Sequence, residues 1–242
     1  MSGSVSQEPV YVLHRRPYRE TSLLVDVFSL NAGRMTLVAR GGNSAKSPLK
    51  AQLQPFQPLL VDWQGRSDLK TLTQTDIRHG PRLVRTGALY SGLYINELLQ
   101  RILPPGDPYP DLFGTYIETL YSLSETDEIE PVLRRFERAL AEAMGFGFEW
   151  GQATDTGQTV EPSLDYGYDP EQGIVSSVLQ DVRLRKLPGN VLLQLEAGDL
   201  DSPVCRRLAK RVMRVLVDHL LQGRPLHSRN LFSHSRGESH ES

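Results

Sequence analysis

Apolar and polar residues alternate along two stretches near the start of the chain. Residues 22–29 and 34–40 each place every second side chain on an apolar face, as expected of a β-strand with one buried side. The four residues between them, Leu-Asn-Ala-Gly, suit a tight turn because Asn and Gly accept positive φ. The two stretches therefore predict a β-hairpin. Further strands are predicted at residues 10–14, 58–63 and 69–75, and five short strands indicate a small barrel.

From about residue 81 the apolar spacing changes to the period of a helix. Helices are predicted over residues 88–102, 113–120 and 132–144, with a short one at 190–196. The last helix begins with Ser202 as N-cap and Pro203 in its first turn, and Gly223 ends it. The fold class is therefore predicted to be α+β, with an all-β N-terminal domain and a mostly α C-terminal domain.

The change of period divides the chain into domains. We expect a barrel domain over residues 1–80 and a helical domain over residues 81–232, with an irregular or short-β insert near residues 151–173. A loop rich in Gly and Ser, residues 41–48, is expected to be mobile. The polar residues 233–242 are expected to form a disordered tail.

Composition places the chain among ordinary globular proteins, with 39% hydrophobic and 23% charged residues. The single cysteine, Cys205, permits neither an internal disulfide nor a cage of zinc-binding thiolates, and its apolar neighbours make it a small core residue. Residues 1–9 lack the apolar stretch of a signal peptide, and no apolar run approaches the roughly 20 residues that span a bilayer. We therefore expect a cytoplasmic protein without a membrane contact.

No sequence motif of a catalytic or metal site is found. The chain lacks the G-x-x-x-x-G-K-[ST] phosphate loop, the G-x-S-x-G elbow, H-E-x-x-H and paired cysteines. Its six histidines are scattered. Because catalytic sites assemble in space, motif absence only lowers the odds of catalysis. We expect no catalytic residue, no metal and no cofactor, and keep a metal-dependent nuclease as a rival class.

Charge is distributed unevenly, although the whole chain carries only −2. Residues 1–80 contain 10 Lys and Arg against 6 Asp and Glu, whereas residues 81–150 contain 6 against 11. A basic barrel suits single-stranded nucleic acid, with cations along the phosphates and aromatic rings stacked on bases. The alternative is solvated arginines and core aromatics. The candidate DNA-binding residues of the barrel are Arg15, Arg16, Arg19, Arg34, Arg40, Lys46, Lys50 and Lys70, and the candidate stacking residues are Tyr11, Tyr18, Phe28, Phe56 and Trp63.

Two basic sets lie on predicted helices. The last helix carries five basic residues that cover a broad outer face, suited either to phosphates or to solvent alone. These candidate DNA-binding residues are Arg206, Arg207, Lys210, Arg211 and Arg214. The third helix carries Arg134, Arg135 and Arg138, which either capture an acidic peptide or pair with the nearby glutamates.

Several segments of the chain share a pattern with one protein family. The longest are the run from Tyr11 to Phe28, Tyr-Val-Leu-His-Arg-Arg-Pro-Tyr-Arg-Glu-Thr-Ser-Leu-Leu-Val-Asp-Val-Phe, followed by Gly33-Arg34, and the run Leu-Tyr-Ser-Gly-Leu-Tyr-Ile-Asn-Glu-Leu-Leu at 89–99. Shorter ones lie at 53–60, 133–137 and 225–232, in the same order as in that family and along most of the chain. These segments resemble RecO, a family of bacterial DNA repair proteins, and the resemblance implies an OB-fold followed by a helical domain.

The resemblance also implies a function and partners. It implies a recombination mediator that binds single- and double-stranded DNA, anneals complementary strands and, with RecR, helps load RecA indirectly. The acidic C-terminal tail of single-strand binding protein is expected to meet the helical domain, with Arg134 at the matching position. Some members carry a four-cysteine zinc module, but the matching stretch near 151–173 has no cysteine here. The alternatives are an interaction scaffold whose DNA contact is indirect and an RNA-binding protein.

Overall fold

The computed structural model describes residues 3–176 and 182–231, so the expected tail at 233–242 lies outside the described residues. Contacts divide the chain into two units. Among the described residues, the first contains residues 3–127 and 225–231, and the second contains residues 128–176 and 182–224. Within the described residues, no helix has the length and apolar character needed to cross a membrane.

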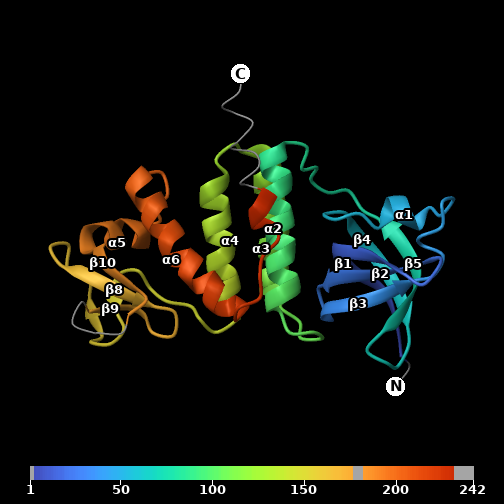
Figure 1. The fold of residues 1–242 in the computed structure, drawn as a ribbon, viewed down its shortest axis with the longest axis horizontal. Helices are drawn as coiled ribbons and strands as arrows, with labels where there is room; N and C mark the ends of the chain where they lie inside the picture. The colour runs from blue at the N-terminus through green and yellow to red at the C-terminus, as the bar shows by residue number, and fades with distance from the viewer. Residues whose placement is uncertain (1–2, 177–181, 232–242) are drawn as a thin grey trace. The chain divides into compact units, whose positions relative to one another are not determined.

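The first unit begins with a closed five-stranded barrel, shown in blue to teal in Figure 1. Its strand order is β1-β2-β3-β5-β4, with β3 and β5 parallel and the other pairs antiparallel. A one-turn helix, α1 (Leu49–Gln52), lies between β3 and β4 in the sequence. This order is that of an OB-type barrel. The strands are β1 (Ser4–Tyr18), β2 (Ser22–Ser29), β3 (Gly33–Ala39), β4 (Pro58–Gln64) and β5 (Lys70–Ile77).

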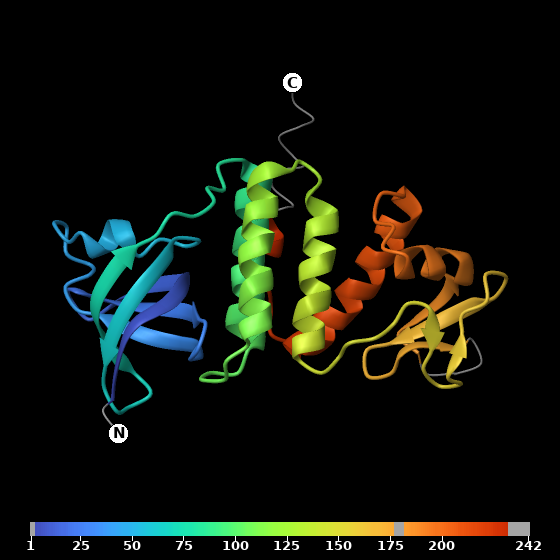
Figure 2. The same ribbon diagram turned by 180° about the vertical axis from the view of Figure 1, so that it is seen from behind.

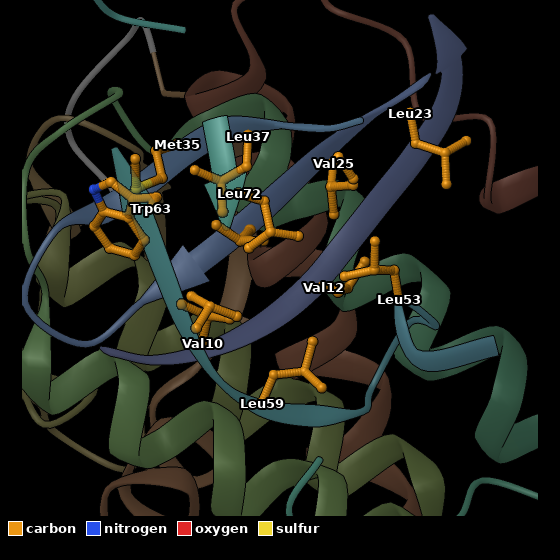
Figure 3. Packing of buried hydrophobic residues seen from close by; sticks show 13 residues of the cluster. Val10, Val12, Leu23, Val25, Met35, Leu37, Leu53, Leu59, Trp63 and Leu72 are labelled. Atoms are coloured by element: carbon orange, nitrogen blue, oxygen red, sulfur yellow. The ribbon is translucent and has the colours of Figure 1, made fainter. Parts of the chain in front are cut away.

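The barrel interior is filled by the alternate residues that the sequence pattern assigned to an apolar face (Figure 3). Val25, Leu37 and Trp63 are each at most 2% exposed. Burying side chains of this size contributes roughly 1.5–3 kcal/mol each. The predicted hairpin is confirmed, with Leu23 opposite Ala39 and Val27 opposite Met35.

Helices α2 (Thr86–Ile102) and α3 (Pro110–Glu125) complete the first unit. The amide of Asn96 in α2 donates to the carbonyls of Val12 and Leu13 at 3.3 and 3.1 Å, and accepts a bond from the Tyr116 hydroxyl at 2.8 Å. Burial raises the Tyr116 pKa well above its usual value. A side chain that satisfies two strand carbonyls fixes α2 against β1 at a bulge in its pairing.

Glycine is required at the turn between β2 and β3. Gly33 has φ +66°, and a Cβ there would lie 1.9 Å from the carbonyl oxygen of Asp107. The same contact region contains a hydrogen bond from the Gly106 amide to the Arg34 carbonyl. The hairpin turn therefore packs directly on the loop between α2 and α3.

Residues 225–231 return to the first unit and are held there by one carboxylate. Glu97 accepts hydrogen bonds from the amides of His227 and Ser228 at 2.9 and 2.8 Å, from the Ser228 hydroxyl at 2.6 Å and from Arg101 at 2.9 Å. Burial opposes ionisation of Glu97, but these donors outweigh it and lower its pKa. The second unit is thus an insertion between two segments of the first.

The second unit combines three helices with two small sheets (Figure 2). The long helices α4 (Ile129–Ala143) and α6 (Pro203–Leu221) pack on each other, and α5 (Gly189–Glu196) packs on α6. Both long helices match the predictions closely, and Cys205 is fully buried on α6 as expected. The sheets consist of β6 (Gln152–Ala153) with β7 (Gln158–Thr159), and of β10 (Leu184–Pro188), β8 (Asp165–Asp169) and β9 (Gly173–Ser176).

Hydrogen bonds and aromatic rings hold the insert of the second unit together. Asp155 accepts bonds from the Ser176 amide and hydroxyl at 2.9 and 2.6 Å, and Glu196 accepts from the amides of Trp150 and Gly151. The ring of Phe148 packs against Trp150 and Tyr168. The described residues contain no cluster of His, Cys, Asp and Glu suited to a metal ion.

Candidate nucleic-acid interface

One end of the barrel gathers basic residues from three segments. Arg16 lies near the end of β1, Arg19 in the turn that leads to β2, and Arg40 directly after β3. The loop after Arg40 is bonded to that turn, because the Asn43 amide donates to the Thr21 carbonyl at 2.8 Å. Lys46 in this loop and Lys50 in α1 complete the set. We call the five exposed residues the barrel-end cluster: Arg16, Arg19, Arg40, Lys46 and Lys50.

The outer face of the barrel beside this cluster is mildly apolar. Arg16 is opposite Leu24, Leu24 is opposite Val38, and Val38 is opposite Thr71, so these four lie in one row across four strands. Leu24, Val38 and Thr71 are all partly exposed. A charged rim beside an apolar floor is the arrangement with which small barrels hold single strands, with phosphates on the charges and bases on the floor.

The cluster takes part in no ion pair of the described residues, although the charge of Arg16 acts on the buried carboxylate of Asp26. Within the described residues, none of its five members has a carboxylate at ion-pair distance. The guanidinium of Arg19 lies over the Tyr18 ring, 5.1 Å from its centre. A group of exposed cations without carboxylate partners produces a positive potential that attracts polyanions.

Three other basic residues of the barrel have partners inside the protein. Arg15 donates to the Lys50 carbonyl, Arg34 donates through Nε to the Leu103 carbonyl at 2.8 Å, and Lys70 donates to the Ser67 carbonyl at 3.3 Å. Arg34 is the second residue of β3, whereas Arg40 comes directly after the strand ends at Ala39, so the two lie at opposite ends of β3. Arg15, Arg34 and Lys70 stay predictions as DNA contacts.

Four of the five candidate stacking residues are core residues instead. Phe28 is fully buried, and Trp63, Tyr11 and Phe56 are 2%, 5% and 8% exposed. Trp63 points into the barrel, whereas Tyr11 and Phe28 pack edge-on against the aromatic rings of α3. The stacking assignment was therefore wrong for these four, because aromatic rings serve equally well to fill a core. Only Tyr18 is partly exposed.

A buried carboxylate lies next to the row that starts at Arg16. Asp26 accepts hydrogen bonds from Thr36 at 2.5 Å and from Gln100 of α2 at 2.6 Å, and His14 lies 3.8 Å away. Burial raises the pKa of Asp26, but these groups and the charge of Arg16 outweigh burial and lower it. Asp26 thus joins the outer face of the barrel to α2.

The basic residues of α6 fall into two groups. Arg206 and Lys210 form ion pairs with Glu128 and Glu130 at the start of α4. The Lys210 bond and the neighbouring cations lower the Glu130 pKa against the opposing effect of its burial. The others are exposed and have no carboxylate at ion-pair distance within the described residues: Arg207, Arg211 and Arg214.

The arginines of α4 are largely occupied by neighbours. Arg134 is 12% exposed and pairs at 2.8 Å with Glu137, which is 2% exposed. Arg138 pairs with Glu142 and also donates to the Phe148 carbonyl. Arg135 is exposed. The buried Nε of Arg134 has no hydrogen-bond partner among the described residues, so this guanidinium retains an unused donor.

Family models match both parts of this architecture. The model described as "Recombination protein O N terminal" matches residues 1–81, and "Recombination protein O C terminal" matches residues 86–230. The chain belongs to the RecO family. The strand-rich N-terminal region and the helical C-terminal region of this RecO-family chain confirm the expected α+β fold.

Curated relatives agree with the family models over nearly the whole chain. A DNA repair protein RecO of Marinobacter nauticus is 63% identical and covers 99% of this chain and 98% of its own length. The corresponding proteins of Actinobacillus pleuropneumoniae serotype 3 and Haemophilus influenzae Rd are 43% and 41% identical, over 92% of this chain. Family membership places the protein among DNA repair and recombination mediators.

The pairing of the α4 arginines with nearby glutamates was one of the two interpretations that the sequence allowed, whereas the partners of Arg206 and Lys210 were not predicted. Glu128 and Glu130 could have been noticed as a pair of acids near the start of a helix, but nothing local links them to Arg206 and Lys210, about 80 positions later. The position of Leu24 and Val38 on the outer face of the barrel could have been predicted, since they alternate with core residues on the predicted strands.

Proposed function

We propose that the protein binds single- and double-stranded DNA through the barrel-end cluster and anneals complementary strands. The observation that carries the proposal is that the five members of the cluster are exposed and, within the described residues, have no carboxylate at ion-pair distance. The apolar row beside them offers a surface for unpaired bases. Membership in a DNA repair family supports the same ligand.

Annealing follows from electrostatics and needs no covalent step. Two complementary strands repel each other through their phosphates, and cations that neutralise some of these charges lower the repulsion. The protein would therefore act as a mediator without catalytic residues or a cofactor. It would act in the cytoplasm, at the nucleoid, where its DNA substrate lies.

The same proposal includes protein partners. RecR and single-strand binding protein would assist the loading of RecA, with the acidic tail of single-strand binding protein bound near Arg134, Arg135 and Arg138. The unused Nε donor of Arg134 and the exposed Arg135 support an anionic ligand at this helix. The pairing of Arg134 with Glu137 means that the ligand would add to an existing ion pair.

The DNA-binding part is tested by a salt series with the full chain and a labelled single strand, followed by fluorescence anisotropy. Five phosphate contacts predict that log K falls with log salt with a slope of about −3.5, or roughly 100-fold between 50 and 200 mM. RNA of the same sequence and a magnesium series serve as comparisons. No binding at low salt would instead make the protein a scaffold, and magnesium-dependent loss of the strand would indicate a nuclease.

The proposed binding of the acidic tail peptide is tested with a variant that leaves no buried charge without a partner. Arg134→Ala would leave the buried Glu137 without its cation, so the double variant R134M/E137M is preferred. It should lose most of its affinity for an acidic tail peptide while its single-strand affinity stays within about twofold, since its changes lie outside the barrel. Unchanged peptide affinity in the folded double variant would contradict the assignment.

A further inference from the structure

Three arginines of α6 form a straight exposed line. Residues four and seven positions apart on a helix lie within about 60° of one another, and three such residues span about 10 Å along the axis. Arg207, Arg211 and Arg214 have this spacing and are all exposed. We call them the α6 stripe. The opposite face of the helix, which includes Cys205, Leu208 and Val212, is buried.

The stripe and its neighbours on the same helix differ in their ion pairs. Arg206 and Lys210 are one position before Arg207 and Arg211, yet both are paired with carboxylates of α4. Among the described residues, none of the stripe residues has a carboxylate at ion-pair distance. The helix thus uses two cations for its own packing and presents three to the outside.

We propose that the α6 stripe is a second DNA site, which binds the backbone of a second strand while the barrel-end cluster holds the first. This rests on the proposed DNA-binding function and deepens it. A DNA strand that is stacked as in a duplex has a phosphate about every 3.4 Å along the axis, so the stripe would span about three phosphates of a strand in this form. Arginine suits this role because its planar fork binds phosphate oxygens in pairs.

The surroundings of the stripe favour a nucleic-acid backbone over an acidic peptide. A peptide with apolar anchors needs an apolar cavity beside the charges. The cavity that adjoins the C-terminal end of α6, about 290 Å³ in volume, has Arg183, Asp218 and His219 in its lining together with Pro170 and Val215. None of the three stripe residues lines this cavity. An apolar anchor bound there would therefore not be held by the stripe itself, whereas phosphates need only the exposed guanidinium groups.

A second surface would add a further physical basis for annealing to the lowered repulsion that the barrel-end cluster provides. A protein with a single polyanion site lowers the charge of the strand that it binds. It has no second surface to hold the complementary strand. A chain with two sites raises the local concentration of the second strand near the first. The barrel-end cluster should therefore determine the affinity for one strand, and the α6 stripe should determine the annealing rate.

The test compares R207Q/R211Q/R214Q with the full parent chain and with the control R206Q/K210Q, which changes the paired cations of the same helix. Two readouts are used at 50 mM salt: the number of labelled 8-nucleotide strands bound per chain, and the annealing rate of complementary strands by energy transfer. Circular dichroism and the Tm establish that each variant is folded.

We expect the parent and the control to bind two short strands per chain and the triple variant to bind one. The triple variant should anneal about tenfold more slowly, while its affinity for the first strand stays within about twofold. An unchanged stoichiometry and rate in the triple variant would overturn the inference, as would an equal loss in the control. Failure of the parent to bind any strand would instead refute the proposed function itself.

Discussion

Two sets of basic residues in this protein, the barrel-end cluster and the paired cations of α4 and α6, behave differently. In the barrel, the barrel-end cluster is exposed and, within the described ranges, has no carboxylate at ion-pair distance. In the second unit, Arg134, Arg138, Arg206 and Lys210 are each paired with a glutamate. The difference teaches that the number of cations in a segment says little about polyanion binding. What matters is how many cations the fold leaves without a partner.

The largest effect on stability is expected when an arginine of a buried ion pair is replaced. Arg134→Ala would leave the buried Glu137 without its cation, and breaking a buried pair of this kind destabilises by about 3 kcal/mol. Arg207→Ala, on the exposed stripe, should change stability by less than about 0.5 kcal/mol. Urea unfolding of both variants measures the contrast. Equal stability of the two variants would show that the buried ion pair of Arg134 with Glu137 does not contribute to stability.

A second effect concerns two carboxylates of the first unit that accept several hydrogen bonds. Asp26 and Glu97 have lowered pKa values in the folded protein, so the unfolded chain binds protons more readily. Their contribution to stability is complete above the ordinary carboxyl pKa values and is lost as the pH falls through the lowered ones. The first unit should therefore lose stability below about pH 4.5.

Substitution of Glu97 alone separates its contribution to stability from that of Asp26. Glu97→Gln should cost about 1–2 kcal/mol at pH 7, because an amide oxygen replaces a charged acceptor for Ser228 and His227. It should also reduce the acid dependence, measured by urea unfolding between pH 7 and pH 3. A variant with the same stability and acid profile as the parent would refute this account of how residues 225–231 are held.

The smallest effect is expected for exposed ion pairs. Arg206→Gln and Lys210→Gln each remove a partner of a partly exposed glutamate, and such surface pairs contribute at most about 1 kcal/mol. The loss should shrink further in 0.5 M salt, because salt screens exposed charges. Thermal unfolding with and without salt measures it. A loss as large as that of Arg134→Ala would erase the distinction between buried and exposed pairs.

Local pattern was enough to predict the barrel hairpin and the long helices. The alternation at 22–29 and 34–40 and the Ser202–Pro203 start of the last helix both reappear in the structure. These features depend on spacing between near neighbours, which a sequence displays directly. The α+β class followed from the change of period near residue 81.

Contacts between distant residues could not be predicted in the same way. Phe28 has the character of either a stacking or a core residue, and only the packing of α3 on β2 decides between them. Glu97 gives no sign in the sequence that it binds residues 130 positions later. The candidate site was therefore predictable as a list of cations, but not as the subset that the fold leaves open.

The central claim is that the barrel-end cluster binds the strand. The direct test is a salt series of single-strand binding by R16Q/R19Q/R40Q, compared with R66Q/R78Q/R82Q, which removes three exposed basic residues outside the cluster. The account predicts that the cluster variant loses about 2 units of salt slope and roughly 30- to 100-fold in affinity at 0.1 M salt, with the control near the parent. Equal slopes and affinities in the two variants would contradict it.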